Sequence, residues 1–168
     1  MKNLKSIIIG VILLSGVVLI VASLSGGNNS DQKNPDRYSA SALSAIEETF
    51  DFNTISMRDG NVSHKFEIKN DGTEPVVINK VYTSCMCTVA YVINGSDKKY
   101  GPFGMPGHTS AATQIEVANG ETATVEIIFD PAAHGPSGVG LAQRSVYLET
   151  NSSVSPTLEF FFQAMVTR

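Results

Sequence analysis

The stretch Asn61-Val62-Ser63-His64-Lys65-Phe66-Glu67-Ile68-Lys69 alternates apolar or aromatic side chains with polar ones. The residues at 62, 64, 66 and 68 occupy every second position, so an extended backbone turns them all to one side. A period of two is typical of a β-strand that buries one face. The stretch therefore predicts a sheet whose apolar face is covered by a second layer.

Turn residues follow this strand and divide a second pair of strands further along the chain. Asn70-Asp71-Gly72 is followed by Pro75 to Thr83, which is rich in Val and Ile. Asn119-Gly120 lies between Thr113 to Val117 and Thr122 to Phe129. Because Asp-Gly and Asn-Gly readily adopt the positive φ of tight hairpin turns, the sequence predicts a β-hairpin at each place.

Three further segments have strand character: Thr88 to Ile93, Ser145 to Thr150 and Thr157 to Val166. No stretch after the first 25 residues shows a convincing helical pattern. About seven short strands separated by turn residues are typical of two packed sheets. The sequence therefore predicts an all-β fold, an antiparallel β-sandwich.

The front of the chain has a different composition. Lys2 and Lys5 precede an apolar segment from Ile7 to Leu24. As a helix, about 18 residues span roughly 27 Å, which is close to the hydrocarbon thickness of a bilayer and longer than the apolar part of a cleavable signal peptide. We expect residues 1–25 to form a single transmembrane helix, with a cleaved signal segment as the alternative. The lysines predict that this end stays in the cytoplasm and that the rest is extracytoplasmic.

Residues 26–47 are mostly polar and begin with Gly26-Gly27-Asn28-Asn29-Ser30, which predicts a flexible linker. The sandwich domain is then expected over residues 48–168. The net charge is −4, and acidic and basic residues are mixed along the chain. Such a chain lacks the basic surface that neutralises phosphates, so we do not expect it to bind nucleic acid.

The chain has two cysteines, Cys85 and Cys87, at the end of the strand that leads from Val81. On an extended strand they would share a face with their Cα atoms about 6.5–7 Å apart, and a turn would bring them closer. Three interpretations stay open: a disulfide, two buried free thiols, or a metal site.

A metal site here would be a soft one. Thiolate and thioether ligands select Cu(I), and imidazole can complete such a site. The segment Gly101 to His108 supplies Met105 and His108. If this segment folds over the cysteines, the predicted ligands are Cys85, Cys87, Met105 and His108.

Other candidate ligands are weaker on sequence grounds. Met86 would point away from the cysteines on an extended strand. A zinc site would need His64 or His134 as a further ligand. We expect His64 to be a core residue that makes one hydrogen bond and His134 to be an exposed loop residue.

Catalysis has little support in the sequence. There is no glycine-rich nucleotide loop, no serine elbow and no shared pair of carboxylates. A thiol oxidoreductase usually places two residues between its cysteines at a helix N-terminus, whereas one residue separates Cys85 from Cys87 and no helix is expected there. We therefore expect a protein that is not an enzyme.

A series of short motifs follows one another in a fixed order from about Thr49 to the C-terminus. They are Phe50-Asp51-Phe52-Asn53-Thr54-Ile55, Gly60, Val62-Ser63-His64-Lys65-Phe66, Asn70-Asp71-Gly72, Pro75, Ile78, Val81, Ser84-Cys85-Met86-Cys87-Thr88, Gly120, Phe129-Asp130, Gly135 and Thr150-Asn151. This order resembles that of a bacterial family of exported immunoglobulin-like domains, the domain-of-unknown-function family 1573. The resemblance implies a Hydin-like, immunoglobulin-like sandwich.

The chain departs from the family pattern at two places near the cysteines. Met86 stands where the family usually has glycine, and the segment from Tyr91 to Ala112 is longer than the usual connection. The family carries no established biochemistry to transfer. The sequence thus predicts a membrane-anchored binding module with a Cu(I) site. The alternative is a structural domain, or one that binds another envelope protein, in which the cysteines form a disulfide or stay as buried thiols.

Overall fold

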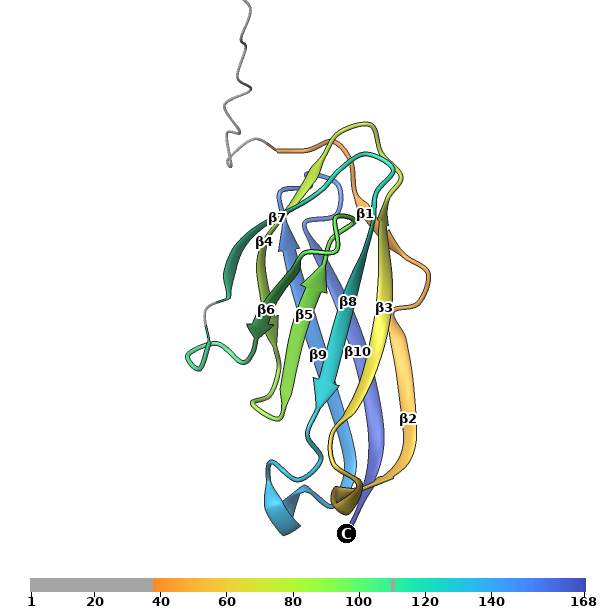
Figure 1. The fold of residues 1–168 in the computed structure, drawn as a ribbon, viewed down its shortest axis with the longest axis vertical. Coiled ribbons are helices and arrows are strands. Elements are labelled where there is room, and N and C mark those ends of the chain that lie inside the picture. Colours follow the sequence, from red (N-terminus) through yellow and green to blue (C-terminus); the bar gives the residue numbers. More distant parts are fainter. Residues whose placement is uncertain (1–37, 110) are drawn as a thin grey trace, which may run out of the picture. The chain divides into compact units, whose positions relative to one another are not determined.

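The computed structural model describes residues 38–109 and 111–168, which form a sandwich of two five-stranded sheets (Figure 1). One sheet has the strand order β1-β3-β8-β5-β6 and the other β2-β10-β9-β4-β7. The strands are β1 (Leu43–Ala45), β2 (Thr49–Ser56), β3 (Val62–Asn70), β4 (Val76–Thr83), β5 (Thr88–Ile93), β6 (Lys99–Phe103), β7 (Ala112–Val117), β8 (Thr122–Phe129), β9 (Gly140–Thr150) and β10 (Thr157–Thr167). Two short 3-10 helices, η1 (Met57–Asp59) and η2 (Gly135–Gly138), are the helical elements of the described residues.

The hydrophobic core lies between the sheets and follows the period of two. In β3, Phe66 and Ile68 are buried, whereas Lys65 and Glu67 are exposed. Phe66 meets Phe160 of the opposite sheet with ring centroids 4.8 Å apart. The predicted all-β sandwich is therefore confirmed. It is not purely antiparallel, because β2 pairs with β10 in parallel.

The prediction of a β-hairpin at Asp71-Gly72 and at Asn119-Gly120 is wrong. β3 and β4 lie in different sheets, and so do β7 and β8. Both turns therefore carry the chain across the sandwich instead of joining paired neighbours. The connections that do join antiparallel neighbours are those between β5 and β6 and between β9 and β10.

The buried side chain of Asn70 explains why the first turn crosses between the sheets. Its Nδ2 donates to the carbonyl oxygens of Glu74 at 2.8 Å and Val117 at 3.0 Å, and its Oδ1 accepts from the backbone N–H of Gly72 at 3.0 Å. Gly72 does not have positive φ. It is needed instead for close approach, because a Cβ there would lie 2.2 Å from the Oγ of Ser41.

The observed sandwich begins within the segment that the sequence analysis assigned to the linker, residues 26–47. Ser39 pairs with the loop after β9, where its N–H donates to the Asn151 carbonyl oxygen at 2.9 Å. Leu43 of β1 is 4% exposed and belongs to the core. One buried leucine in a polar segment is too weak a pattern to predict a strand, which is why the predicted boundary falls late.

The predicted N-terminal anchor, residues 1–25, lies outside the described residues. Among the residues that the structure describes, no helix is long and apolar enough to cross a membrane.

Three connections gather at the end of the sandwich opposite the Asn70 turn (Figure 1). They are the β4–β5 turn, the β8–β9 loop with η2, and the β2–β3 connection with η1. The strand register brings them together, because Val62 at the start of β3 and Thr88 at the start of β5 both pair with Phe129 at the end of β8. Both cysteines lie at this end.

Candidate functional site: a cysteine and histidine cluster

The two cysteines lie on a tight turn instead of an extended strand. The N–H of Thr88 donates to the carbonyl oxygen of Cys85 at 3.2 Å, which closes a four-residue turn between β4 and β5. The hydroxyl of buried Thr83 donates to the carbonyl oxygens of Cys85 at 2.9 Å and Thr88 at 3.1 Å. Met86 lies on the turn and is 55% exposed. The turn thus brings the cysteine side chains together and leaves Met86 toward solvent.

Both ends of this turn are hydrogen-bonded to the sandwich. Ser84 exchanges two hydrogen bonds of 2.9 Å with Ser145 of β9. The carbonyl oxygen of Cys87 accepts from the N–H of Asp130 at 2.9 Å, directly after β8. The position of the cysteines is therefore fixed by strands of both sheets.

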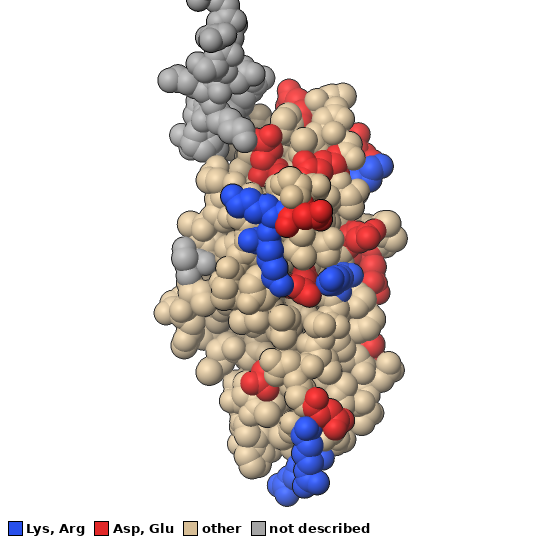
Figure 2. Space-filling view, viewed as in Figure 1, with Lys and Arg blue, Asp and Glu red and all other residues tan. Residues whose placement is uncertain are grey.

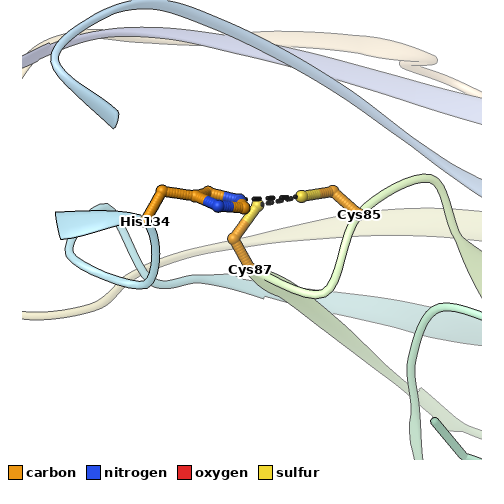
Figure 3. Close-up of side chains that lie close together, drawn as sticks. All are labelled: Cys85, Cys87 and His134. Atoms are coloured by element: carbon orange, nitrogen blue, oxygen red, sulfur yellow. Dashed lines mark hydrogen bonds between the residues drawn. The ribbon is translucent and has the colours of Figure 1, made fainter. Parts of the chain in front are cut away.

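The Sγ atoms of Cys85 and Cys87 are 2.7 Å apart, and both cysteines are free thiols. His134 approaches from the β8–β9 loop, with its Nε2 3.2 Å from the Sγ of Cys85. Figure 3 shows the imidazole ring and the two sulfurs converging from these two loops. The three ligand atoms all lie within 4.8 Å of one another.

Asp130 anchors the loop that carries His134. Its Oδ1 accepts from the N–H of Ala132 at 2.8 Å, and the N–H of Gly135 donates to the Ala132 carbonyl oxygen at 2.8 Å. Gly135 has a φ of 55°, a conformation that glycine adopts without strain. The N–H of Asp130 also donates to the carbonyl oxygen of Cys87. Asp130 therefore hydrogen-bonds to both the His134 loop and the cysteine turn.

Arg144 of β9 supplies a positive charge beside the sulfurs. Its Nε donates to the Sγ of Cys87 at 3.1 Å, and its Nη1 donates to the carbonyl oxygen of Gln143 at 2.7 Å. A guanidinium held by the backbone in this way is a fixed donor to a thiolate.

These neighbours separate the acidities of the two thiols. Burial opposes ionisation of Cys85, but hydrogen bonds from the side chain and backbone of Cys87, the contact with His134 and the charge of Arg144 outweigh it. Together they lower the pKa of Cys85 to about 7. Burial and the hydrogen bond to Cys85 raise the pKa of Cys87, although Arg144 acts in the opposite direction. Cys85 is therefore the sulfur that carries negative charge first.

The structure brings together two of the four ligands predicted from the sequence, Cys85 and Cys87. His108 is exposed on the loop between β6 and β7 and is not part of the cysteine and histidine cluster found among residues 38–109 and 111–168. Its N–H donates to the carbonyl oxygen of Met105 at 3.1 Å, so both residues belong to a local turn.

His134 is exposed, as predicted, but its contact with Cys85 was not foreseen. His64 makes a hydrogen bond, as predicted, but it is not one of the buried core residues. It is half-buried, its Nε2 lies 3.0 Å from the Oε2 of Glu47, and its ring stacks on Phe50 with centroids 3.5 Å apart.

On the face shown in Figure 2, basic side chains are interleaved with acidic ones. Lys99 lies 2.6 Å from a carboxylate oxygen of Glu126, and Lys65 lies 4.0 Å from the other oxygen of the same group. This face has no continuous basic surface.

Comparison with known families identifies part of the chain. The model of a family described as "Protein of unknown function (DUF1573)" covers the cysteine turn. Residues 43–96 match the DUF1573 family. The resemblance predicted from the sequence is thereby confirmed over β1 to β5. The DUF1573 match includes Cys85 and Cys87 but ends before His134 and before the neighbouring Arg144.

A solved structure shows a similar fold at low sequence identity. A protein of unknown function from Porphyromonas gingivalis W83 is 15% identical with a TM-score of 0.54, and the match covers 82% of this chain and 51% of that one. The DUF1573-matching chain thus spans about half the length of that protein. The ASH/PapD-like domain 7 of human CEP192 is 15% identical with a TM-score of 0.46, over 79% and 90% of the two chains. No curated protein matches the sequence significantly.

Proposed function

We propose that this chain is an extracytoplasmic binding module, tethered by its N-terminal segment, that binds Cu(I) through Cys85, Cys87 and His134. The observation that carries the proposal is the convergence of two thiol sulfurs and one imidazole nitrogen within 4.8 Å of one another. Thiolates are soft ligands and favour Cu(I), and imidazole suits copper as well.

The number of ligands favours Cu(I) over a structural zinc ion. Structural zinc sites almost always have four protein ligands. The cluster found among the described residues offers three groups of the His, Cys, Asp or Glu type. Cu(I) accepts a set of soft ligands without demanding that fourth group, so the available side chains are sufficient for it.

Charge balance also supports a monovalent ion. Two thiolates and one Cu(I) leave a single negative charge, which the guanidinium of Arg144 neutralises from 3.1 Å. With Zn²⁺ the thiolates would already cancel the metal charge, and Arg144 would remain as an uncompensated cation in a half-buried position. The fixed arginine therefore fits a dithiolate site with a monovalent metal.

Binding is proposed here, not catalysis, because the three side chains come from a hydrogen-bonded turn and an anchored loop, an arrangement that would hold a metal ion in place. The second candidate is a structural or protein-interaction domain. It is favoured by the 3% exposure of Cys87, which belongs to the hydrophobic core, and by the packing of Cys85 against that core. In that case the cysteines would contribute only to the stability of the sandwich.

The two functions are distinguished by anaerobic titration of the reduced full chain with Cu(I) against a chromogenic Cu(I) chelator. The metal module predicts one equivalent of tightly held Cu(I), lost in the Cys85→Ser, Cys87→Ser double variant. His134→Ala is expected to weaken binding at least about tenfold, because it removes one of three ligands. His108→Ala is the matched control, an exposed histidine outside the cluster, and should bind like the wild type. Equal Cu(I) binding by the wild type and all three variants, or no binding by any of them, would contradict the metal site and favour the structural domain.

A further inference from the structure

We propose that the metal-free Cys85 and Cys87 pair exchanges with an external disulfide, with Cys85 attacking first and Cys87 completing the reaction. This reactivity uses the same two sulfurs as the proposed copper site but does not rest on metal binding. It follows from how unequally the two thiols are exposed and how close together they are held.

The unequal exposure of the two cysteines determines which sulfur an external molecule reaches. Cys85 is half-buried, whereas Cys87 is only 3% exposed. An attacking sulfur must approach the S–S bond of its target directly, so access selects the reacting thiol. A disulfide that arrives from solvent therefore meets Cys85.

The second step depends on the distance between the two sulfurs. The Sγ of Cys87 lies 2.7 Å from the Sγ of Cys85. The hydrogen bonds from Thr83 and Thr88 hold the turn, so the two sulfurs stay together when Cys85 is modified. A mixed disulfide on Cys85 is therefore placed directly beside the thiol that can displace it.

The reaction balances without any further oxidant. The Cys85 thiolate forms a bond to one sulfur of the external disulfide, whose S–S bond breaks and releases one thiolate. Cys87 then gives up its proton and bonds to the Sγ of Cys85, which expels the second thiolate. The chain loses two hydrogens and gains an internal disulfide, and the external disulfide is reduced to two thiols.

Glutathione disulfide is the probe for small disulfides, and disulfide-bonded insulin is the probe for protein disulfides. The reduced, metal-free full chain is mixed with each probe, quenched in acid at intervals and analysed by intact mass and peptide mapping. With glutathione disulfide we expect an early adduct on Cys85, then an internal disulfide and two glutathione molecules released per chain. Reaction with either probe supports the exchange, and the ratio of their rates tells which class is preferred.

Single-cysteine variants test the order of the two steps. Cys87→Ser should keep a stable glutathione adduct on Cys85, because the resolving thiol is gone. Cys85→Ser should react at least about tenfold more slowly, because Cys87 is buried. The wild-type peptide map gives the same information if a variant fails to fold.

Three results would overturn the inference: no reaction with either probe, a first adduct on Cys87, or adducts that persist on the wild-type chain. The copper titration separates this inference from the proposed function. A chain that binds Cu(I) but does not exchange overturns the exchange alone, and a chain that exchanges without binding Cu(I) overturns the metal site alone.

Discussion

Replacing Arg144 by methionine should make the Cys85 and Cys87 pair less acidic. Methionine keeps the length and the apolar packing of the arginine stem but removes the guanidinium that lies 3.1 Å from the Sγ of Cys87. The Sγ of Cys87 donates to the Sγ of Cys85 across 2.7 Å, so the charge of Arg144 acts on the pair, which titrates with apparent pKa values of its own. Without Arg144 the first proton should leave the pair less readily.

The size of this effect follows from the lost hydrogen bond to the Sγ of Cys87, because the second lost bond, from Nη1 to the Gln143 carbonyl oxygen, does not involve a sulfur. Hydrogen bonds to charged groups contribute about 1.5–3 kcal/mol, and the half-buried position of Arg144 puts this one at the lower end. About 1.4 kcal/mol corresponds to one pKa unit. The first apparent pKa should therefore rise from about 7 to roughly 8. At pH 7 the thiolate fraction then falls from about one half to about one tenth, roughly a fivefold decrease.

The assay is the rate of alkylation of the reduced chain by iodoacetamide, measured from pH 5 to 10, since only the thiolate reacts. Gln143→Met on the same strand is the matched control, because its side chain is exposed and hydrogen-bonds to Gln163 of β10 instead of to a sulfur. An Arg144→Met profile that overlays the wild type, or one that moves to lower pH, would refute the electrostatic role given to this arginine.

Three further predictions concern stability. Asn70→Ala removes three hydrogen bonds made by a buried side chain and should cost about 2–4 kcal/mol in urea unfolding. Asn79→Ala, whose hydrogen bond is exposed, should change stability by less than about 0.5 kcal/mol, and similar losses in the two variants would contradict the role given to Asn70 in the turn. Gly72→Ala should destabilise the chain by about 1–3 kcal/mol because its Cβ meets Ser41, and an unchanged midpoint would disprove this crowding. Because the pKa of Cys85 is lowered from 9.0 to about 7, the native chain binds fewer protons than the unfolded one in this window. Under reducing conditions the wild type should therefore gain stability over Cys85→Ser as the pH rises from 7 to 9, and equal slopes would argue against the lowered pKa.

Alternation along the chain predicted the strands well because each residue's burial depends on its own position in a two-residue repeat. The pairing of strands could not be predicted in the same way. Asn70-Asp71-Gly72 has the composition of a hairpin turn, but the buried amide of Asn70 binds the carbonyl oxygen of Val117, which is 47 residues away. Such a contact depends on the order of strands within the sheets, and no local pattern reports that order.

In the candidate site, too, the residues that are close in sequence could be predicted to lie together, and those from distant segments could not. The spacing of Cys85 and Cys87 identified the sulfur pair, because both ligands come from one turn. The histidine that joins them comes from the loop after β8, whereas the sequence favoured His108 from the loop after β6. A useful indication was Phe129-Asp130 followed by Gly135, which ends a strand and bends the chain beside His134. No sequence pattern indicated Arg144, because its side chain reaches Cys87 only through the pairing of β9 with β4.

Cys85, Cys87 and His134 are proposed to form one Cu(I) site, and X-ray absorption at the copper edge reports the ligands of the bound ion. The full chain loaded with one equivalent of Cu(I) should show two sulfur ligands and one imidazole nitrogen. The His134→Ala chain should keep the two sulfurs and lose the imidazole signal, while His108→Ala should match the wild type. An imidazole signal that persists without His134, or a copper bound without sulfur, would contradict the account.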